Sequence, residues 1–265
     1  MRSSLNTSAV RLLAVASVAV SLGACSTPAP EPSSAADAAR EVLEEAITDT
    51  TQVVGFAIGA DVTLLEGRTV MKRRLYPGDP DDAVPSTEGG PWVAGSDFDL
   101  DVALTRAEEE LAGCSGGGRV DVRVLSPEAT VTATTCDDDT VRVLLGDREL
   151  GALGKDAPAA LTSLVDDLDE AGLADQVTSV EFDASRSTVT AAYRGDDPRR
   201  EYRWIRGWAT PSSLVTFSDT TPRTPMDPAA LRSAPTELKQ ELSEGSDLIS
   251  LVAAEDGGSI EVERA

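Results

Sequence analysis

The sequence predicts an α+β fold made of tandem units, each a helix followed by an antiparallel three-stranded meander, with the helices packed on one face of the sheets. Three observations predict it: two blocks of the chain resemble each other, each block begins with helical spacing of apolar residues, and each continues in short runs rich in Val and Thr. Amphipathic sheets of this kind bury one face under helices, which gives a layered α+β arrangement.

Two blocks of the chain align with each other at a shift of 57 residues that becomes 58 partway along. The alignment contains eleven identities in order, separated by a single one-residue slip. Internal self-similarity of this kind indicates a duplicated unit. The identical positions pair Ala103-Leu104-Thr105 with Ala160-Leu161-Thr162, Leu111 with Leu168, Val122 with Val180, Thr130-Val131-Thr132-Ala133 with Thr188-Val189-Thr190-Ala191, and Asp138-Asp139 with Asp196-Asp197.

Each block starts with the spacing of an amphipathic helix. In the second block Leu161, Leu164, Val165 and Leu168 recur at three- and four-residue intervals, with acidic residues on the other side. Short alternating runs rich in Val and Thr then predict three strands, separated by turn residues that favour tight hairpins. In the first block these strands are expected at 119–125, 129–135 and 140–145, with turns at 126–128 and 137–139.

The flanking segments follow the same order of elements. A helix is expected at 36–48 with strands at 53–58, 62–65 and 69–76, and another helix at 228–244 with strands at 248–254 and 259–263. Residues 77–96 are rich in Gly, Pro and Asp and are expected to form a linker or a long surface loop. The folded part therefore divides into units at 36–96, 97–150, 151–222 and 223–265, the last of them truncated.

The N-terminus has the layout of an export signal. Residues 1–24 begin with positive charge at Arg2, continue into an apolar run at 12–20 and end in small residues before Cys25. The apolar run is too short for a membrane span, which takes roughly 20 residues. Residues 25–35 carry prolines and almost nothing to bury, and they are expected to form a tether.

The residues Leu22-Gly23-Ala24-Cys25 resemble the lipobox of bacterial lipoproteins. The resemblance implies that Cys25 receives a diacylglyceryl group, that the signal peptide is cut just before it, and that lipid holds the protein on the outer face of the cell membrane. Two or more acyl chains give the stable anchoring that one chain does not. The alternative is an ordinary signal peptide with an incidental cysteine.

The other two cysteines, Cys114 and Cys136, are expected to form a disulfide, because an even pair outside the cytoplasm is normally oxidised. The alternative is a metal site. It has little support, because the chain contains no histidine and two thiols do not complete a zinc shell. The acidic pairs also lack the ligand spacing of a calcium-binding EF-hand loop. The sequence therefore predicts no metal and no cofactor.

Charge and motif content exclude several classes of function. The formal net charge of −23 makes nucleic acid an improbable partner, because phosphate binding depends on basic residues. The absence of histidine excludes a Ser-His or Cys-His nucleophile pair, and no nucleophile elbow or phosphate-binding loop occurs. The sequence therefore predicts a protein that is not an enzyme.

One segment, residues 199–208, differs from the rest of this acidic, aromatic-poor chain, since it holds two of the three tryptophans and four arginines. In a strand, alternate residues share a face. Tyr202, Trp204, Arg206 and Trp208 then lie on one face and Arg203 on the other, and these five residues are the candidate binding site. The alternative is that the aromatic residues face the helix layer as core.

The element order of residues 97–209 loosely resembles the tandem helix-and-meander modules of PepSY-like and beta-lactamase-inhibitor-like extracytoplasmic proteins, and this resemblance implies binding to other proteins. The leading hypothesis is a non-catalytic binding module for an envelope protein or a cell-wall component. A lipid or small-ligand carrier, with a cavity between sheet and helices, is the second hypothesis. A hydrolase is the third.

Overall fold

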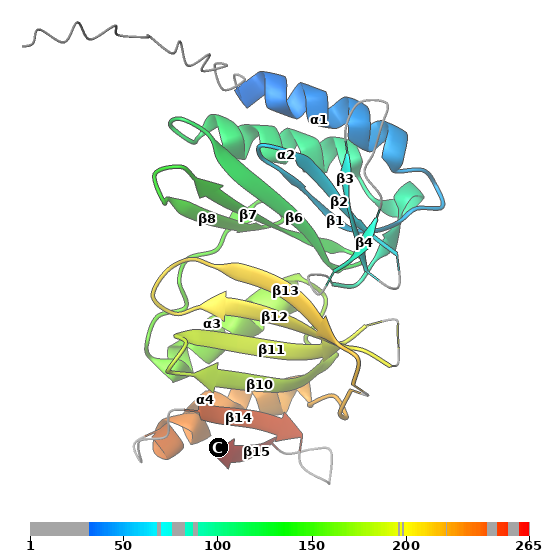
Figure 1. The fold of residues 1–265 in the computed structure, drawn as a ribbon. Helices are drawn as coiled ribbons and strands as arrows, with labels where there is room; N and C mark the ends of the chain where they lie inside the picture. Colours follow the sequence, from blue (N-terminus) through cyan, green and yellow to red (C-terminus); the bar gives the residue numbers. More distant parts are fainter. Residues whose placement is uncertain are drawn as a thin grey trace, which may run out of the picture.

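The computed structural model describes residues 32–67, 70–75, 83–86, 90–195, 197, 199–220, 222–242, 248–253 and 260–264. Within them it has four α-helices and two antiparallel sheets, which confirms the predicted α+β class (Figure 1). The helices are α1 (Pro32–Ala46), α2 (Leu100–Ala112), α3 (Ala157–Glu170) and α4 (Pro228–Leu242). None of the described helices is long and apolar enough to cross a membrane.

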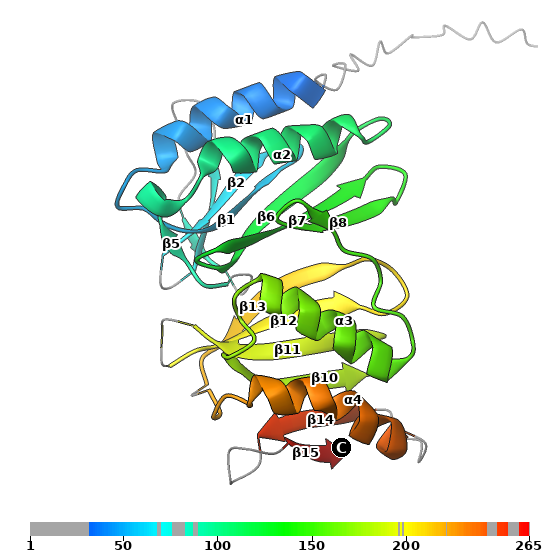
Figure 2. The same cartoon turned by 180° about the vertical axis from the view of Figure 1, so that it is seen from behind.

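The first sheet has the strand order β4-β3-β2-β1-β6-β7-β8-β9, with β5 also paired to β1. Helices α1 and α2 lie side by side on one face of this sheet, as both views show (Figures 1 and 2). Phe56, Val122, Leu104 and Leu43 fill the space between these helices and the sheet. Its strands are β1 (Gln52–Ile58), β2 (Val62–Glu66), β3 (Met71–Leu75), β4 (Val84–Pro85), β5 (Val93–Ala94), β6 (Gly118–Ser126), β7 (Ala129–Cys136), β8 (Val141–Leu145) and β9 (Arg148–Glu149).

The second sheet has the order β13-β12-β11-β10-β14-β15, and α3 and α4 cover one of its faces (Figure 2). Its core includes Leu161, Leu164 and Leu168 of α3 packed with Trp204 and Leu251 of the strands. Its strands are β10 (Val177–Asp183), β11 (Thr188–Arg194), β12 (Glu201–Gly207), β13 (Ser213–Ser218), β14 (Leu248–Ala253) and β15 (Ile260–Arg264).

One of the hydrophobic clusters contains residues of both sheets. Leu125 and Val143, on the face of the first sheet that turns away from α1 and α2, belong to the same buried cluster as the residues of α3. The Tyr193 hydroxyl donates a hydrogen bond of 3.1 Å to the Leu125 carbonyl. The connection after β9 docks on the end of β12, because Leu153 N–H donates to Gly207 O and Gly154 N–H to Trp208 O, both at 3.0 Å.

Several boundaries differ from the sequence prediction. Helix α1 begins at Pro32, so residues 32–35, expected in the tether, form its first turn; proline is tolerated there because the first amides of a helix have no intrahelical partner. The segment 77–96, expected to be a linker or loop, contributes β4, β5 and the start of a 3-10 helix at Gly95–Asp97 to the described structure. Strand β13 was not predicted, although Val215 and Phe217 alternate with Leu214 and Thr216.

The predicted signal peptide, Cys25 and the N-terminal part of the tether lie outside the described residues.

Candidate functional site

The candidate binding strand from the sequence is β12, an interior strand of the second sheet. Tyr202, Trp204 and Arg206 are 2%, 0% and 2% exposed and face the helix layer. The structure therefore agrees with the alternative interpretation, in which this face of the strand is part of the core. Trp208 is half-buried beside Phe182, with ring centroids 6.4 Å apart. Because these side chains point inward, they form no exposed binding face in this structure.

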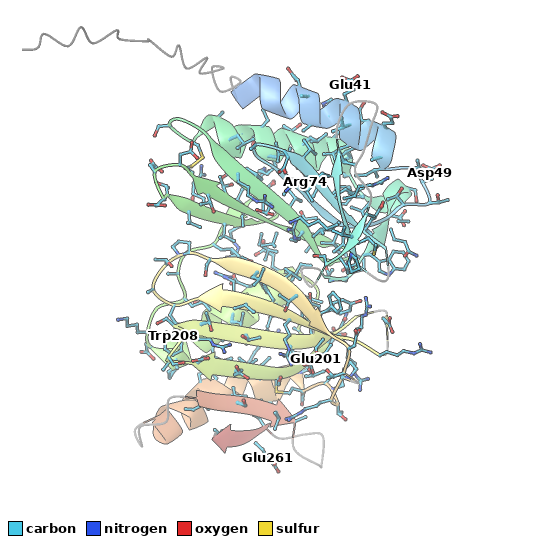
Figure 3. All side chains as sticks on the ribbon, viewed as in Figure 1. Glu41, Asp49, Arg74, Glu201, Trp208 and Glu261 are labelled. Atoms are coloured by element: carbon cyan, nitrogen blue, oxygen red, sulfur yellow. A yellow bond between two sulfur atoms is a disulfide. The ribbon has the colours of Figure 1, made fainter. Side chains whose placement is uncertain are left out.

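The fifth candidate residue, Arg203, lies on the opposite face of β12 with 47% of its side chain exposed. Its guanidinium pairs with Glu201, which is labelled in Figure 3, at 3.2 Å. The sequence correctly separated Arg203 from the other four residues. It did not show which face of the strand is covered.

Arg206 belongs to a buried ion network that joins the first sheet to the second sheet and its helix α3. It pairs with Asp167 of α3 and donates from Nη2 to the Gly151 carbonyl at 2.9 Å. Asp167 also pairs with Arg148 of β9 at 2.7 Å. Burial lowers the pKa of Arg206, although the attraction of Asp167 opposes this effect. The hydrogen bond to Asp167 raises the pKa of Arg148. The network therefore joins α3, β12 and the first sheet at their junction.

The predicted disulfide between Cys114 and Cys136 is confirmed, with a Cα–Cα distance of 5.3 Å. It fastens the end of α2 to the end of β7. Gly118 allows the close approach, because a Cβ there would lie 2.9 Å from both Cys114 Sγ and the Thr135 carbonyl. Both cysteines are buried, so the bond is a structural feature of the first sheet and its helices.

The most distinctive surface feature is a cavity of about 400 Å³, here called the inter-sheet groove. Its lining residues come from the helix-free face of the first sheet and from β13. Strand β13 is the edge strand of the second sheet that lies nearest the first sheet (Figure 1). The lining residues come from β3, β6 and β7 on one side and from β13 on the other. They are Lys72, Arg119, Asp121, Arg123, Val131, Ala133, Thr135, Ser213, Leu214 and Val215.

The alternation along β6 places charge in this groove. Val120, Val122 and Val124 pack in the core under α1 and α2, so the residues between them point to the other face. The groove therefore receives Arg119, Asp121 and Arg123 from a single strand. Arg123 lies opposite Gly55 of β1, and a Cβ at Gly55 would come within 3.0 Å of the Arg123 side chain. Glycine at 55 therefore makes room for Arg123.

Asp121 orients both arginines of the groove. Arg119 donates to it from Nε at 2.7 Å and from Nη2 at 2.9 Å, and Arg123 donates from Nη2 at 3.0 Å. Arg123 Nη1 also donates to the carbonyls of Phe56 and Val122, so this guanidinium is fixed in place. With Lys72 on the same lining, the described lining residues of the groove include three basic side chains and one carboxylate, in a chain whose net charge is −23.

A second cavity, of about 260 Å³, lies beside the N-terminal half of α2. Most of the charged side chains in its lining are acidic, and the cation among the described lining residues, Arg106, pairs with Asp147 and donates to the Gly146 carbonyl at 3.3 Å. Asp99 in this lining caps α2 by accepting a hydrogen bond from Val102 N–H at 3.0 Å. Arg106, Asp147 and Asp99 already have structural partners, so this cavity is the weaker candidate for a binding site.

No group of three or more metal-ligating side chains occurs among the residues that the structure describes. The groove offers cationic donors, two hydroxyl side chains and an apolar wall, which suits binding of an anion with an apolar part. Sequence reasoning missed this site, because the alternation of Arg119, Asp121 and Arg123 was visible but the approach of β13 was not.

No family model and no curated protein matches this chain. A solved structure found by fold comparison is that of a proliferating cellular nuclear antigen from Entamoeba histolytica, with 11% identity, 86% of this chain and 90% of that chain covered, and a TM-score of 0.17. That score is too low to support an argument about fold or function.

Proposed function

We propose that this protein is a membrane-anchored extracytoplasmic lipoprotein that acts as a non-catalytic binding module for an envelope protein or a cell-wall component, and that the inter-sheet groove is its binding site. The lipobox-like residues that end at Cys25 support the location. The basic groove supports the binding role.

The observation that carries the proposal is the sign of charge in the groove. Lys72, Arg119 and Arg123 converge on it, although acidic residues outnumber basic ones 46 to 23 in the whole chain. A cleft lined mainly by one sign of charge focuses the field within its low-dielectric walls, so it attracts an anion even when the net charge of the protein is negative. Such a local reversal of sign favours an anionic ligand or partner group.

The position of the tether suits a groove that faces away from the anchor. Helix α1 starts seven residues after Cys25. The exposed side chains of α1 include Glu41, labelled in Figure 3, together with Glu44 and Glu45, and an anionic membrane surface repels them. The groove lies on the other face of the first sheet, where an envelope partner has access.

The finer architecture is proposed to come from duplication of a helix-plus-meander unit. Each of the four helices is followed by an antiparallel run of strands. In each sheet the first strands after the two helices pair with each other, β1 with β6 and β10 with β14. The eleven identities between the two central blocks support the same origin.

The carrier hypothesis receives less support. It requires an apolar cavity between sheet and helices, and the described side chains in those layers form buried clusters around Leu104 and Trp204. The inter-sheet groove lies outside the helix-sheet layers and has a mixed polar and apolar lining. A small ligand in this groove therefore fits a binding module better than it fits a lipid carrier.

The experiment compares the envelope material retained by the immobilised wild-type chain and by the Lys72→Met/Arg119→Met variant. We expect the variant to lose the retained component, because two of the three groove cations are removed. The control is Arg186→Ala, an arginine that is 80% exposed and pairs only with the nearby Asp183 among the described residues. Equal retention by wild type and groove variant contradicts the proposed site.

The proposed anchor has its own test. Changing Cys25 to serine removes the acyl acceptor, so we expect the protein to move from the membrane fraction to the medium or the soluble envelope fraction. Protein that stays membrane-bound after this change contradicts lipid anchoring at Cys25.

A further inference from the structure

We infer that a second site, the cavity of about 260 Å³ beside the N-terminal half of α2, binds an alkylammonium group. This cavity is here called the α2 cavity. It lies on the helix-covered side of the first sheet, opposite the inter-sheet groove, so the two sites are independent. Three observations lead to it: a buried hydroxyl without a partner, two carboxylates without a cation, and an exposed apolar side chain in the lining.

Strand β7 divides its side chains between the two cavities. Val131 and Ala133 line the inter-sheet groove, whereas Thr130 and Thr132 line the α2 cavity. Helix α2 lies over the sheet on this second side and contacts β6 and β7 (Figure 2). Because alternate residues of a strand share a face, Thr132 points away from the groove and lies on the face that α2 covers.

Thr132 supplies the buried polar group of the α2 cavity. Only 4% of the residue is exposed, and its hydroxyl has no hydrogen-bond partner among the residues that the structure describes. Its oxygen is not among the fully sealed atoms that lack a partner, so it is open to the cavity that Thr132 lines. Thr134, on the same face and 1% exposed, donates to Glu110 at 3.2 Å. An unpaired buried hydroxyl costs free energy, so Thr132 favours a ligand that pairs with it.

The carboxylates of the α2 cavity favour a cation as that ligand. Asp97 and Glu128 line the cavity, and neither forms an ion pair with a described residue. Asp97 accepts one hydrogen bond, of 3.4 Å, from the neighbouring Ser96. The other acidic residues of the lining already have the structural partners given above. These two carboxylates are therefore available to a positively charged donor.

A primary ammonium suits this set of acceptors. It carries three donors on a compact charged centre, whereas a guanidinium is a wider planar fork. The carboxylates and the Thr132 hydroxyl are all acceptors for such donors, and a hydroxyl has two lone pairs for this purpose. A metal ion is not indicated, since the described residues contain no group of three or more metal-ligating side chains.

The apolar part of the lining fits a short alkyl stem. Val102 of α2 is 58% exposed, one of three large hydrophobic side chains that are exposed among the described residues. It also lines a neighbouring cavity of about 220 Å³. The α2 cavity lies just below the usual range of ligand sites, about 300–1,000 Å³, so it suits a small molecule or a single side chain. Cationic chains place their stem on apolar surface while the charged head stays in polar surroundings.

The test uses the full chain with Cys25→Ser, which keeps it free of lipid, and butylamine as the probe in an NMR titration at low salt and neutral pH. Butanol and butyrate are the matched ligands, because they have similar stems without charge and with negative charge. We expect butylamine to bind at least about tenfold more tightly than butanol, since hydrogen bonds to charged groups are roughly twice as strong as neutral ones. Butyrate should give no measurable binding. The methyl signals of Thr132 and Val102 should shift with the same dissociation constant.

The Thr132→Val variant removes the hydroxyl and keeps the branched shape. We expect it to weaken butylamine binding about tenfold and to leave the free protein at least as stable as the wild type, because an unpaired buried hydroxyl is lost. The matched control, Thr134→Val, should show the reverse. It loses the bond to Glu110 and therefore stability, while its butylamine affinity should change less than about twofold. Loss of structure cannot produce the pattern expected for Thr132→Val.

The carboxylates are tested by Asp97→Asn and Glu128→Gln, which remove charge with little change of shape. We expect each to weaken butylamine binding about fivefold, and we expect the affinity of the wild type to fall as salt is added. The matched control is Asp175→Asn, which removes an exposed carboxylate that does not line the cavity. It should change affinity less than about twofold.

Two sources of the ammonium, a lysine side chain of a partner protein and a small free amine, are distinguished by a further probe. Nα-acetyl-lysine methylamide represents the lysine side chain. Affinity equal to that of butylamine identifies a protein lysine, and binding of butylamine alone identifies a free amine. Either result supports the inference when Thr132→Val weakens the binding.

Equal affinity for butylamine and butanol overturns the inference. Unchanged butylamine binding in Thr132→Val, or in the double variant Asp97→Asn/Glu128→Gln, overturns it as well. None of these results bears on the proposed function, which depends on retention of envelope material by the inter-sheet groove.

Discussion

Strands β6 and β12 each carry two arginines, and the surroundings of the strands give these arginines different roles. In β12 Arg206 points under the helix layer, is 2% exposed and pairs with Asp167. In β6 Arg119 and Arg123 point away from the helices and line a groove. The covered face of a sheet, and not the composition of the strand, therefore decides whether an arginine supports the fold or is accessible to a ligand. The first predictions test the β12 side of this comparison.

The largest effect is expected from Arg206→Met. Removing Arg206 leaves the buried Asp167 with Arg148 as its remaining cationic partner. Loss of one member of a buried ion pair destabilises a fold by about 3 kcal/mol. The free energy of unfolding in denaturant measures this loss. The matched control is Arg203→Met on the same strand, where a partly exposed arginine pairs with the buried Glu201 and the loss should be clearly smaller than for Arg206→Met. Equal effects of the two substitutions would refute the contrast between the faces of β12.

A smaller effect is expected from removing the disulfide in Cys114→Ala/Cys136→Ala. The bond closes a separation of 22 residues, and a loop of that length stabilises by about 3 kcal/mol through restriction of the unfolded chain. Denaturant unfolding measures the loss, and reducing agent should lower the stability of the wild type but not of the variant. Binding of an anionic partner group in the groove should persist under conditions where the variant is folded, because neither Cys114 nor Cys136 lines the groove.

The sequence predicted the strands of the first sheet better than it predicted which elements cover them. The strands expected at 119–125 and 129–135 appear as Gly118–Ser126 and Ala129–Cys136, because alternating Val and Thr are a local signal that survives folding. The disulfide was predictable, since its two cysteines are the pair that remains once Cys25 is set aside. Local patterns therefore gave the strands and the covalent link.

The sites could not be predicted because they depend on contacts between distant segments. A period of two separates the faces of a strand but does not reveal which neighbour covers each face. For β12 the covering element is α3, and for the groove it is β13, which was not predicted at all. The aromatic residues of 199–208 suggested a binding face, yet Trp204 is completely buried and donates to Ser213 Oγ at 2.7 Å.

A third prediction concerns Tyr193, which joins the two sheets through its bond to the Leu125 carbonyl. Burial, and to a lesser extent Tyr202, raises the pKa of the Tyr193 phenol well above its usual range. The neutral phenol therefore contributes stability that is fully present below the pKa of an unfolded tyrosine, about 10, and is lost as the pH rises through the higher folded-state value. Absorbance at alkaline pH should show Tyr193 ionising only when the protein unfolds.

The matched variant for this residue is Tyr193→Phe, which removes the hydroxyl alone. It should cost about 1 kcal/mol, the usual contribution of one hydrogen bond. Early ionisation of Tyr193 in the folded protein would contradict its burial between the sheets.

The smallest effect on stability, and the sharpest test of the comparison, is expected from Arg119→Met in β6. Its pair with Asp121 leaves 42% of the Arg119 side chain exposed, and pairs of that kind contribute about 0–1 kcal/mol. The variant should therefore unfold almost like the wild type while losing anion binding about tenfold. Arg206→Met should show the reverse, a large loss of stability with little change in anion affinity under conditions where it remains folded. If Arg119→Met instead destabilised the fold as much as Arg206→Met and left binding intact, both strands would be structural and the groove would have no role as a site.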